Sequence, residues 1–244
     1  MSAGSSYSCD ATESVAKETR DKQEKTQVEL LPLGYDFNVY ASITEKDGTA
    51  GTFRLTFRNK GKIGTALNVY SYVKADANRG AWFYALEKPG KDGVPVTLAD
   101  DYDLGSRAGK YEFAVHGPSG YLSEFRGDAN NAGQKLIADI VNVAASTDGT
   151  GVVRFDFGEW PGANGDLTMI NAYTTETATI AAKTASIASA TKDGWYDVAF
   201  IDKAGTGYLR RYAGHVENGQ IGKSDPAIGM QYDAKRRTYV GVTA

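Results

Sequence analysis

The chain is 244 residues long, and 41% of its residues are hydrophobic while 23% are charged. This balance is ordinary for a chain that buries a core, so it excludes wholesale disorder. The net charge of -3 gives no broad cationic surface, which argues against nucleic acid as a partner. The 15 Tyr and 28 Gly, against 3 Met, favour an all-β fold, because aromatic side chains suit half-buried sheets and glycine suits tight turns.

Residues 1–30 are predicted to be a flexible, charged leader, because their alternating charges leave almost no apolar face to bury. A short solvated helix over residues 11–25 is the alternative. Cys9 is the only cysteine, so the sequence offers neither an intrachain disulfide nor a cysteine metal cluster. No apolar run approaches the roughly 20 residues that span a bilayer, and the N-terminus lacks the basic-then-apolar pattern of a secretion signal.

After the leader, short alternating runs separated by turn residues predict a meander of strands. Phe53, Leu55 and Phe57 alternate with Arg54 and Thr56, which is the period of a sheet with one solvated side. The glycines of GKIGTA lie between two runs and are predicted to form hairpin turns. The predicted strands are YDFNVYASI, GTFRLTFRN, TALNVYSYV, AWFYAL, PVTLA and KYEFAVH.

The second half of the sequence repeats the first. KYEFAVHGPSGYLSEFRG reappears as GWYDVAFIDKAGTGYLRRYAG, in which Tyr111 matches Tyr196 and Gly127 matches Gly214. FDFGEWPGANGDLTMINAY is in turn similar to LTFRNKGKIGTALNVYSY. The prediction is two tandem immunoglobulin-like or fibronectin-like antiparallel β-sandwich modules, residues 31–130 and 131–229, each with a self-contained core. Residues 230–244 are predicted to be a tail or an edge strand.

The Ala- and Thr-rich stretch 174–194 gives a mixed signal. Alanine favours helix, whereas Thr and Ser alternating with small apolar residues suit strands. Two short strands are the favoured interpretation.

No residue pattern predicts catalysis, a metal or a cofactor. His116 and His215 each lie beside a turn, and no G-x-S-x-G string provides a nucleophile for either. An enzyme of unfamiliar type that uses one of these histidines is kept as a minor alternative. The carboxylates of Asp100, Asp101 and Asp103 are interpreted as solvated strand-end groups, because the glycine and glutamate of a calcium loop are missing.

Five residues are candidates for ligand binding. Trp82, Tyr84 and Trp160 are aromatics that could stack on sugars or insert at a lipid interface, although most aromatics of small sandwiches lie in the core. Arg210 and Arg211 could fork onto a phosphate or a carboxylate. The alternative for this pair is that one arginine bridges to a nearby acid and the other is solvated.

A family resemblance rests on the strings RRYAGHVE and SDPA, with support from YEFAVHGPSGYLSEFRG and LTFRNKGKIGTALNVYSY. Together they resemble the duplicated C-terminal domain of bacterial phosphocholine-specific phospholipases C, of the non-hemolytic or hemolytic type. The resemblance covers roughly residues 31–229. The Ala-rich stretch and FGEWPGANGD depart from the pattern expected of that family.

In that family, phosphodiester hydrolysis belongs to a large N-terminal domain similar to alkaline phosphatases, and this sequence has no counterpart of it. The resemblance therefore implies a non-catalytic accessory region of a secreted or periplasmic enzyme of lipid metabolism. Its implied partners are a phosphodiesterase domain, in the same chain or a separate one, and a phospholipid surface. The alternative is a free-standing β-sandwich module that binds carbohydrate or lipid surfaces.

Overall fold

The computed structural model describes residues 27–46, 49–131, 138–145, 151–157, 166–203, 205–217 and 219–241. Within these ranges the chain forms antiparallel strands and one short 3-10 helix, so the predicted all-β class is confirmed. None of the described helical segments is long and apolar enough to cross a membrane. Cys9, Trp160 and the helix considered for residues 11–25 lie outside the described residues.

The first half of the fold contains β1 (Glu29–Leu30), β2 (Phe37–Lys46), β3 (Thr49–Asn59), β4 (Thr65–Ser71), the 3-10 helix η1 (Lys74–Asp76), β5 (Trp82–Leu86), β6 (Val96–Asp103), β7 (Lys110–His116) and β8 (Leu122–Asp128). The second half contains β9 (Ala138–Ala145), β10 (Gly151–Phe157), β11 (Leu167–Asn171), β12 (Thr177–Ile180), β13 (Ser186–Ala190), β14 (Trp195–Asp202) and β15 (Leu209–His215). Three short strands follow, β16 (Gly222–Lys223), β17 (Met230–Asp233) and β18 (Thr238–Gly241).

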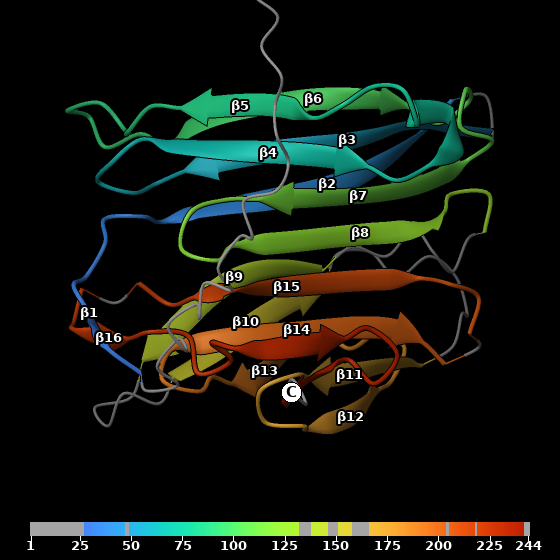
Figure 1. The fold of residues 1–244 in the computed structure, drawn as a ribbon. Helices are drawn as coiled ribbons and strands as arrows, with labels where there is room; N and C mark the ends of the chain where they lie inside the picture. The colour runs from blue at the N-terminus through green and yellow to red at the C-terminus, as the bar shows by residue number, and fades with distance from the viewer. Residues whose placement is uncertain are drawn as a thin grey trace, which may run out of the picture.

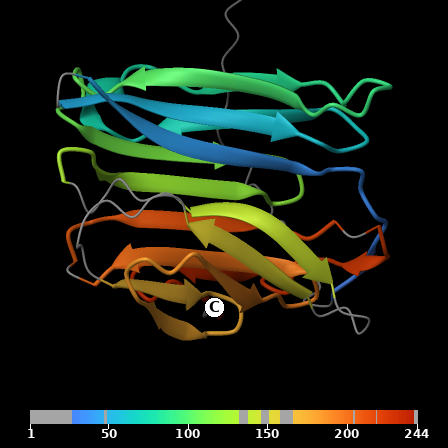
Figure 2. The same ribbon diagram turned by 180° about the vertical axis from the view of Figure 1, so that it is seen from behind.

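One long sheet runs through both halves of the molecule, in the order β12-β11-β14-β15-β8-β7-β4-β5 (Figure 1). Two three-stranded sheets, β2-β3-β6 and β13-β10-β9, lie on its other face, as the view from behind shows (Figure 2). Aromatic contacts join the layers in each half, stacked in the first and edge-on in the second. Phe53 of β3 lies 5.0 Å from Phe113 of β7, and Phe155 of β10 lies 5.0 Å from Phe200 of β14, measured between ring centroids.

The two halves use their strands in the same way. In the first half β3 is the centre of its three-stranded sheet and β4 pairs with β7; in the second half β10 and β11 take the corresponding places. The matched residues also pair alike, since Tyr111 lies opposite Gly127 and Tyr196 lies opposite Gly214. A Cβ atom on Gly127 would lie 2.3 Å from the Tyr111 hydroxyl, and one on Gly214 would lie 3.0 Å from the Tyr196 hydroxyl. Each tyrosine therefore needs a glycine opposite it.

The prediction of two self-contained cores is wrong. β8 pairs with β15, so the long sheet has no break between the halves. The Phe125 and Tyr212 rings approach to 6.0 Å across this pairing, and the buried apolar residues of both halves form one cluster. A module boundary near residue 130 stays a prediction about the sequence repeat.

The alternation of apolar and polar residues predicted for GTFRLTFRN, which lies in β3, is confirmed. Phe53, Leu55 and Phe57 are fully buried against the long sheet, whereas Arg54 on the opposite face is exposed and pairs with Asp101. The two short strands expected in the Ala-rich stretch are also present, as β12 and β13. They belong to different sheets, because the chain crosses from one layer to the other between them.

Other local predictions need correction. The strands do not form a simple meander, because β4 leaves the sheet of β2 and β3 and β6 returns to it. GKIGTA is accordingly not a hairpin but the connection between the two layers, held by the Asn59 side chain, which accepts a hydrogen bond from the Gly61 N–H at 2.9 Å. The end of the predicted leader, β1, pairs with β16, and the tail forms its own hairpin of β17 and β18.

The 3-10 helix is fixed by a buried ion pair. Asp76 accepts hydrogen bonds from Arg107 Nε and Nη2, both at 2.9 Å, and from the Ser71 hydroxyl at 2.6 Å. The side chains of Asp76 and Arg107 are 4% and 7% exposed. Burial by itself raises the pKa of Asp76, but the hydrogen bonds and charge of Arg107, with the Ser71 bond, bring it below the usual 3.8.

This depressed pKa makes a pH prediction for Asp76→Asn. A carboxyl with a lowered folded-state pKa contributes stability above its unfolded pKa and loses that contribution as the pH falls through the folded value. The variant should be less stable than the native chain at neutral pH, and the difference in unfolding free energy should shrink below about pH 4. Urea denaturation at a series of pH values measures this difference, and a difference that is constant with pH would contradict it.

Candidate functional site

The pairing of β8 with β15, which we call the seam, is symmetric with respect to the repeat. Glu124 lies opposite Arg211, and these two residues occupy matching positions in the two halves. The same holds for the neighbouring pairs. Phe125 lies opposite Arg210, and their counterparts in the repeat, Tyr212 and Ser123, also lie opposite each other. The two halves are therefore related by a local twofold axis through the Glu124–Arg211 pair.

Arg211 is the centre of a charged cluster on the outer face of the seam. Its Nε and Nη2 donate to the two oxygens of Asp197 at 2.8 and 2.7 Å, and its Nη1 donates to Glu124 at 3.0 Å. The hairpin of β17 and β18 covers this cluster, with the Tyr239 hydroxyl donating to Asp197 at 2.8 Å and the Tyr232 ring 3.6 Å from Arg211 Cζ. Burial lowers the pKa of Arg211, but the hydrogen bonds and charge of Asp197 leave it raised, so the cation is permanent.

Arg210 points the other way, into the core, because neighbouring strand residues face opposite sides of a sheet. It is fully buried, so the expectation that one arginine of the pair is solvated is wrong. Its Nη1 donates to the carbonyls of Arg126 at 3.0 Å and Leu209 at 2.8 Å, and its Nη2 donates to the Tyr111 hydroxyl at 2.8 Å. The guanidinium lies over the rings of Tyr208 and Tyr111, at 4.5 and 5.0 Å from their centroids.

The charge of Arg210 has no carboxylate partner among the described residues, and its Nε has no hydrogen-bond partner there. An unpaired buried cation is costly, since burial removes its hydration. Tyrosine faces and carbonyl oxygens supply the compensation that the structure does contain.

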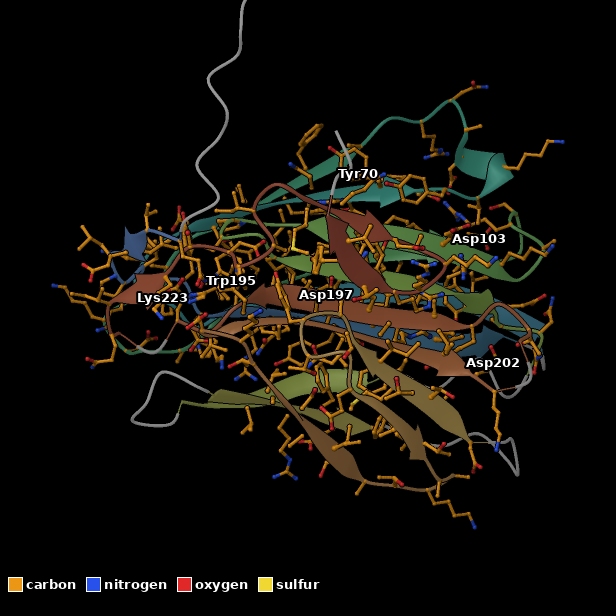
Figure 3. All side chains as sticks on the ribbon, turned by 60° about the horizontal axis from the view of Figure 1, so that its bottom comes forward. Tyr70, Asp103, Trp195, Asp197, Asp202 and Lys223 are labelled. Atoms are coloured by element: carbon orange, nitrogen blue, oxygen red, sulfur yellow. The ribbon has the colours of Figure 1, made fainter. Side chains whose placement is uncertain are left out.

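Two hollows lie at opposite ends of the seam. The first, of about 890 Å³, we call the basic hollow. Asp103 and Asp202 hold two of its lining residues: Asp103 accepts the Ser106 N–H at 2.9 Å, and Asp202 accepts the N–H and hydroxyl of Thr206 at 2.8 and 2.7 Å. Figure 3 labels both aspartates at one end of the sheet, and Trp195 and Lys223 at the other. The charged residues that line the basic hollow are Lys74, Arg107, Lys110, Glu112, Arg126 and Asp128.

The second hollow, of about 490 Å³, we call the aromatic hollow. Trp195 and His215 form one wall, with ring centroids 4.9 Å apart, and the Trp195 Nε1–H donates to the Lys223 carbonyl at 2.7 Å. His215 Nδ1 lies 3.1 Å from Glu217 Oε1, while Glu217 Oε2 accepts the Leu33 N–H at 3.0 Å. Glu217 thus links the histidine to the segment before β2.

His215 has the acid that a catalytic histidine would need, and the Ser119 hydroxyl in the same hollow is buried without a hydrogen-bond partner among the described residues. The imidazole is nevertheless closely packed. A Cβ atom on Gly194 would lie 2.8 Å from His215 Nε2, and one on Gly222 would lie 3.1 Å from it. The contacts described for His215 are those of a packed side chain.

The two hollows are counterparts of each other under the repeat. Lys110 and Asp128, opposite each other at the basic end, correspond to Trp195 and His215, opposite each other at the aromatic end. The turn residue Thr206 in one corresponds to Ser119 in the other. The repeat has therefore built one hollow twice and lined the two copies differently.

Two other predicted ligand-binding residues, Trp82 and Tyr84, lie away from the seam. Trp82 and Tyr84 are on β5, the last strand of the long sheet, and both pack against the core. The Tyr84 ring stacks on Phe57 at 4.5 Å, and its hydroxyl donates to Asp100 at 2.5 Å. The four candidate residues that the structure describes are not gathered into one site, and the ligand roles of all five stay predictions.

The acidic run and the histidines are also dispersed. Asp100, Asp101 and Asp103 bind Tyr84, Arg54 and the Ser106 N–H respectively, so their carboxylates do not converge. His116 is exposed at the end of β7 and packs edge-on against Tyr70. Across the described ranges, no group of three or more His, Cys, Asp or Glu residues is placed to hold a metal ion.

Apart from His215, the residues that line the hollows were not singled out from the sequence. Lys110, Arg126 and Trp195 sit at the ends of the repeated strings, but each hollow also takes a residue from the other half, Thr206 or Ser119, which the pairing of β8 with β15 brings close. A signal did exist in the repeat, because the two copies match in their tyrosines and glycines and differ in charge at these positions.

Comparison with known proteins agrees with the sequence motifs. Residues 30–128, from β1 to the end of β8, match the family model described as bacterial phospholipase C, C-terminal domain. The expected resemblance is confirmed. A non-hemolytic phospholipase C of Burkholderia pseudomallei is 30% identical over 234 residues, which cover 87% of this chain and 29% of the relative. A hemolytic phospholipase C of Pseudomonas aeruginosa is 28% identical over 227 residues, covering 85% of this chain and 30% of the relative.

A non-hemolytic phospholipase C of Pseudomonas aeruginosa is 25% identical over 222 residues, which again cover 86% of this chain and 30% of the relative. The chain thus spans about a third or less of the length of the curated relatives that it matches. The similarity extends well beyond the range of the family model, into the second half of the repeat.

Proposed function

We propose that the chain is a non-catalytic accessory region that acts together with a phospholipase C-type phosphodiesterase domain. The observation that carries this proposal is the coverage: the chain matches 29–30% of the length of phospholipases C, and its family model is that of their C-terminal domain. Phosphodiester hydrolysis would then belong to the remaining part of such an enzyme. A secreted or periplasmic location, which the resemblance implies, is part of the same proposal.

The contacts of the polar side chains support this assignment. Arg211 is held by two carboxylates, and His215 is enclosed by glycine backbone and Trp195. General acid or base catalysis needs a group that can exchange a proton with a substrate, whereas the described polar contacts of both side chains are to groups of the protein itself.

The segment that precedes β2 offers a surface for the phosphodiesterase domain. It is tied to the second half by the pairing of β1 with β16 and by the bond from Leu33 to Glu217. Leu31, which lines the aromatic hollow, is 78% exposed, and Ile221, directly before β16, is 64% exposed. Neighbouring exposed apolar side chains are typical of interaction surfaces.

A hydrolysis assay tests the proposal. The purified chain is incubated with phosphatidylcholine vesicles and with a chromogenic phosphocholine ester, and release of phosphocholine is measured. We expect no turnover above the buffer blank. Turnover that disappears in His215→Ala, while the circular dichroism spectrum is unchanged, would contradict the proposal and favour an enzyme that uses His215.

A lipid- or carbohydrate-surface-binding module is the second candidate, favoured by one observation. Phe83 on β5 is 75% exposed, next to Trp82 in the last strand of the long sheet. An exposed aromatic at a sheet margin is suited to insertion or stacking. This candidate requires co-sedimentation with vesicles or insoluble polysaccharide that Phe83→Ala abolishes; absence of sedimentation with either surface rejects it.

A further inference from the structure

The basic hollow has an excess of cations in a chain whose net charge is -3. Four cationic side chains line it against the two carboxylates of Glu112 and Asp128. Arg107 is neutralised by Asp76, as described above. Lys74 and Lys110 are exposed and make no ion pair within the described part of the chain.

Arg126 connects the hollow to the seam. Its Nε donates to the Gly207 carbonyl at 2.8 Å, in the turn between β14 and β15, and its Nη1 lies 3.7 Å from Glu112. The distance to Glu112 is too long for a hydrogen bond, so this guanidinium is positioned by the Gly207 carbonyl more than by an acid. Arg126 is therefore held at the wall of the hollow by Gly207, which also lines it.

A further positive charge lies directly behind the wall. Tyr111 lines the hollow, and its hydroxyl accepts the 2.8 Å hydrogen bond from Arg210. Arg210 is fully buried, and no carboxylate among the described residues balances it. In surroundings of low dielectric this charge acts over a longer distance than a solvated one, so it favours an anion in the hollow.

The fold does not require these cations. At the matching end of the seam Trp195 takes the place of Lys110 and Ala213 takes the place of Arg126, with the same backbone pairing. The shape of the hollow is thus compatible with neutral residues at both positions. Lysine and arginine at the basic end need an explanation other than packing.

We infer that the basic hollow binds the phosphate group of an organic phosphate, with Lys74, Lys110 and Arg126 as its direct cationic contacts. Three cations on two sides of one hollow suit a group with several anionic oxygens better than a single carboxylate. The exposed ring of Tyr72 and the side chains of Val73 and Ala108 provide an apolar wall for the organic part. The inference does not depend on a phosphodiesterase partner.

Glycerol 3-phosphate is the probe for a soluble ligand, and titration calorimetry with the full chain measures its binding. We expect saturable binding that weakens as salt is raised, because the contacts are charge pairs at the surface. Lys74→Glu and Lys110→Glu should each weaken binding by at least about tenfold, since each loses a charge-assisted hydrogen bond. Lys91→Glu makes the same charge change on an exposed loop outside the hollow and should leave binding unchanged.

A second arm identifies the source of the phosphate. Co-sedimentation with phosphatidylglycerol vesicles that Lys110→Glu abolishes supports a lipid headgroup; binding of glycerol 3-phosphate without sedimentation supports a soluble phosphate. Acetate serves as the carboxylate control. The inference is overturned if neither phosphate source binds, if acetate binds as tightly as glycerol 3-phosphate, or if the Lys91 and Lys110 variants behave alike. Hydrolysis of phosphatidylcholine, which tests the proposed function, is a separate readout.

Discussion

Replacing Arg211 by alanine is expected to lower the free energy of unfolding by about 3–5 kcal/mol. The substitution removes both hydrogen bonds to Asp197, whose side chain is only 1% exposed. The carboxylate would remain buried with the Tyr239 hydroxyl as its described donor, and an uncompensated buried charge is strongly destabilising. Urea denaturation followed by circular dichroism measures the change.

Arg54→Ala is the matched control. Arg54 makes the same two-bond contact with Asp101, at 2.6 Å for each bond, but both side chains are about half exposed. Solvent screens such a pair, so its removal should change stability little. Equal losses of unfolding free energy in the two variants would show that the Arg211–Asp197 pair does not owe its contribution to stability to its burial.

Phe125→Ala is expected to cost about 3–5 kcal/mol and to destabilise both halves together. Phe125 is fully buried, and its ring contacts Phe53 in the first half at 5.9 Å and Tyr212 in the second at 6.0 Å. Because the core is continuous across the seam, we expect one unfolding transition in both the native chain and the variant. Differential scanning calorimetry measures the number of transitions and the shift.

Phe83→Ala provides the comparison, since Phe83 is 75% exposed and its removal creates no cavity. It should leave the unfolding transition nearly unchanged. Two separate calorimetric transitions in the native chain, or a Phe125→Ala effect limited to one of them, would contradict a shared core.

Much of the local structure was predictable from the sequence, because it depends on short-range patterns. Phe53, Leu55 and Phe57 alternate with polar residues, and that period alone assigns their buried face. The correspondence of Tyr111 with Tyr196 and of Gly127 with Gly214 also follows from the sequence, and the structure adds that each tyrosine lies opposite its glycine. Which segments form strands, and which residues of the two copies correspond, can be recognised within segments a few residues long.

The arrangement of strands was less predictable, because hydrophobic alternation does not specify which strand is the neighbour. Nothing in LSEFRG indicates that it pairs with LRRYAG, so the seam and the continuous core were missed. The burial of Arg210 was also missed, because two adjacent arginines suggest a solvent-exposed position. Alternation forces one of them inward, and three aromatic rings and two carbonyls make its burial tolerable.

The candidate site depended on that missing arrangement. Single residues such as Trp82 and Arg211 were selected by chemical type, and the structure finds them in ordinary packing and ion-pair roles. The hollows are formed by residues from both halves, such as Lys110 and Thr206, or Ser119 and Trp195. Their proximity follows from the pairing of β8 with β15, which sequence patterns do not encode.

That pairing has a consequence for how a protein of this kind avoids self-association. A strand with one unpaired side offers backbone N–H and C=O groups to any other chain, which makes it a template for aggregation. In the long sheet β8 and β15 occupy this vulnerable position in their respective halves, and each hydrogen-bonds the backbone groups that the other would leave unpaired. Either half by itself would display such a strand to solvent, so duplication within one chain replaces intermolecular association with an internal contact at fixed stoichiometry.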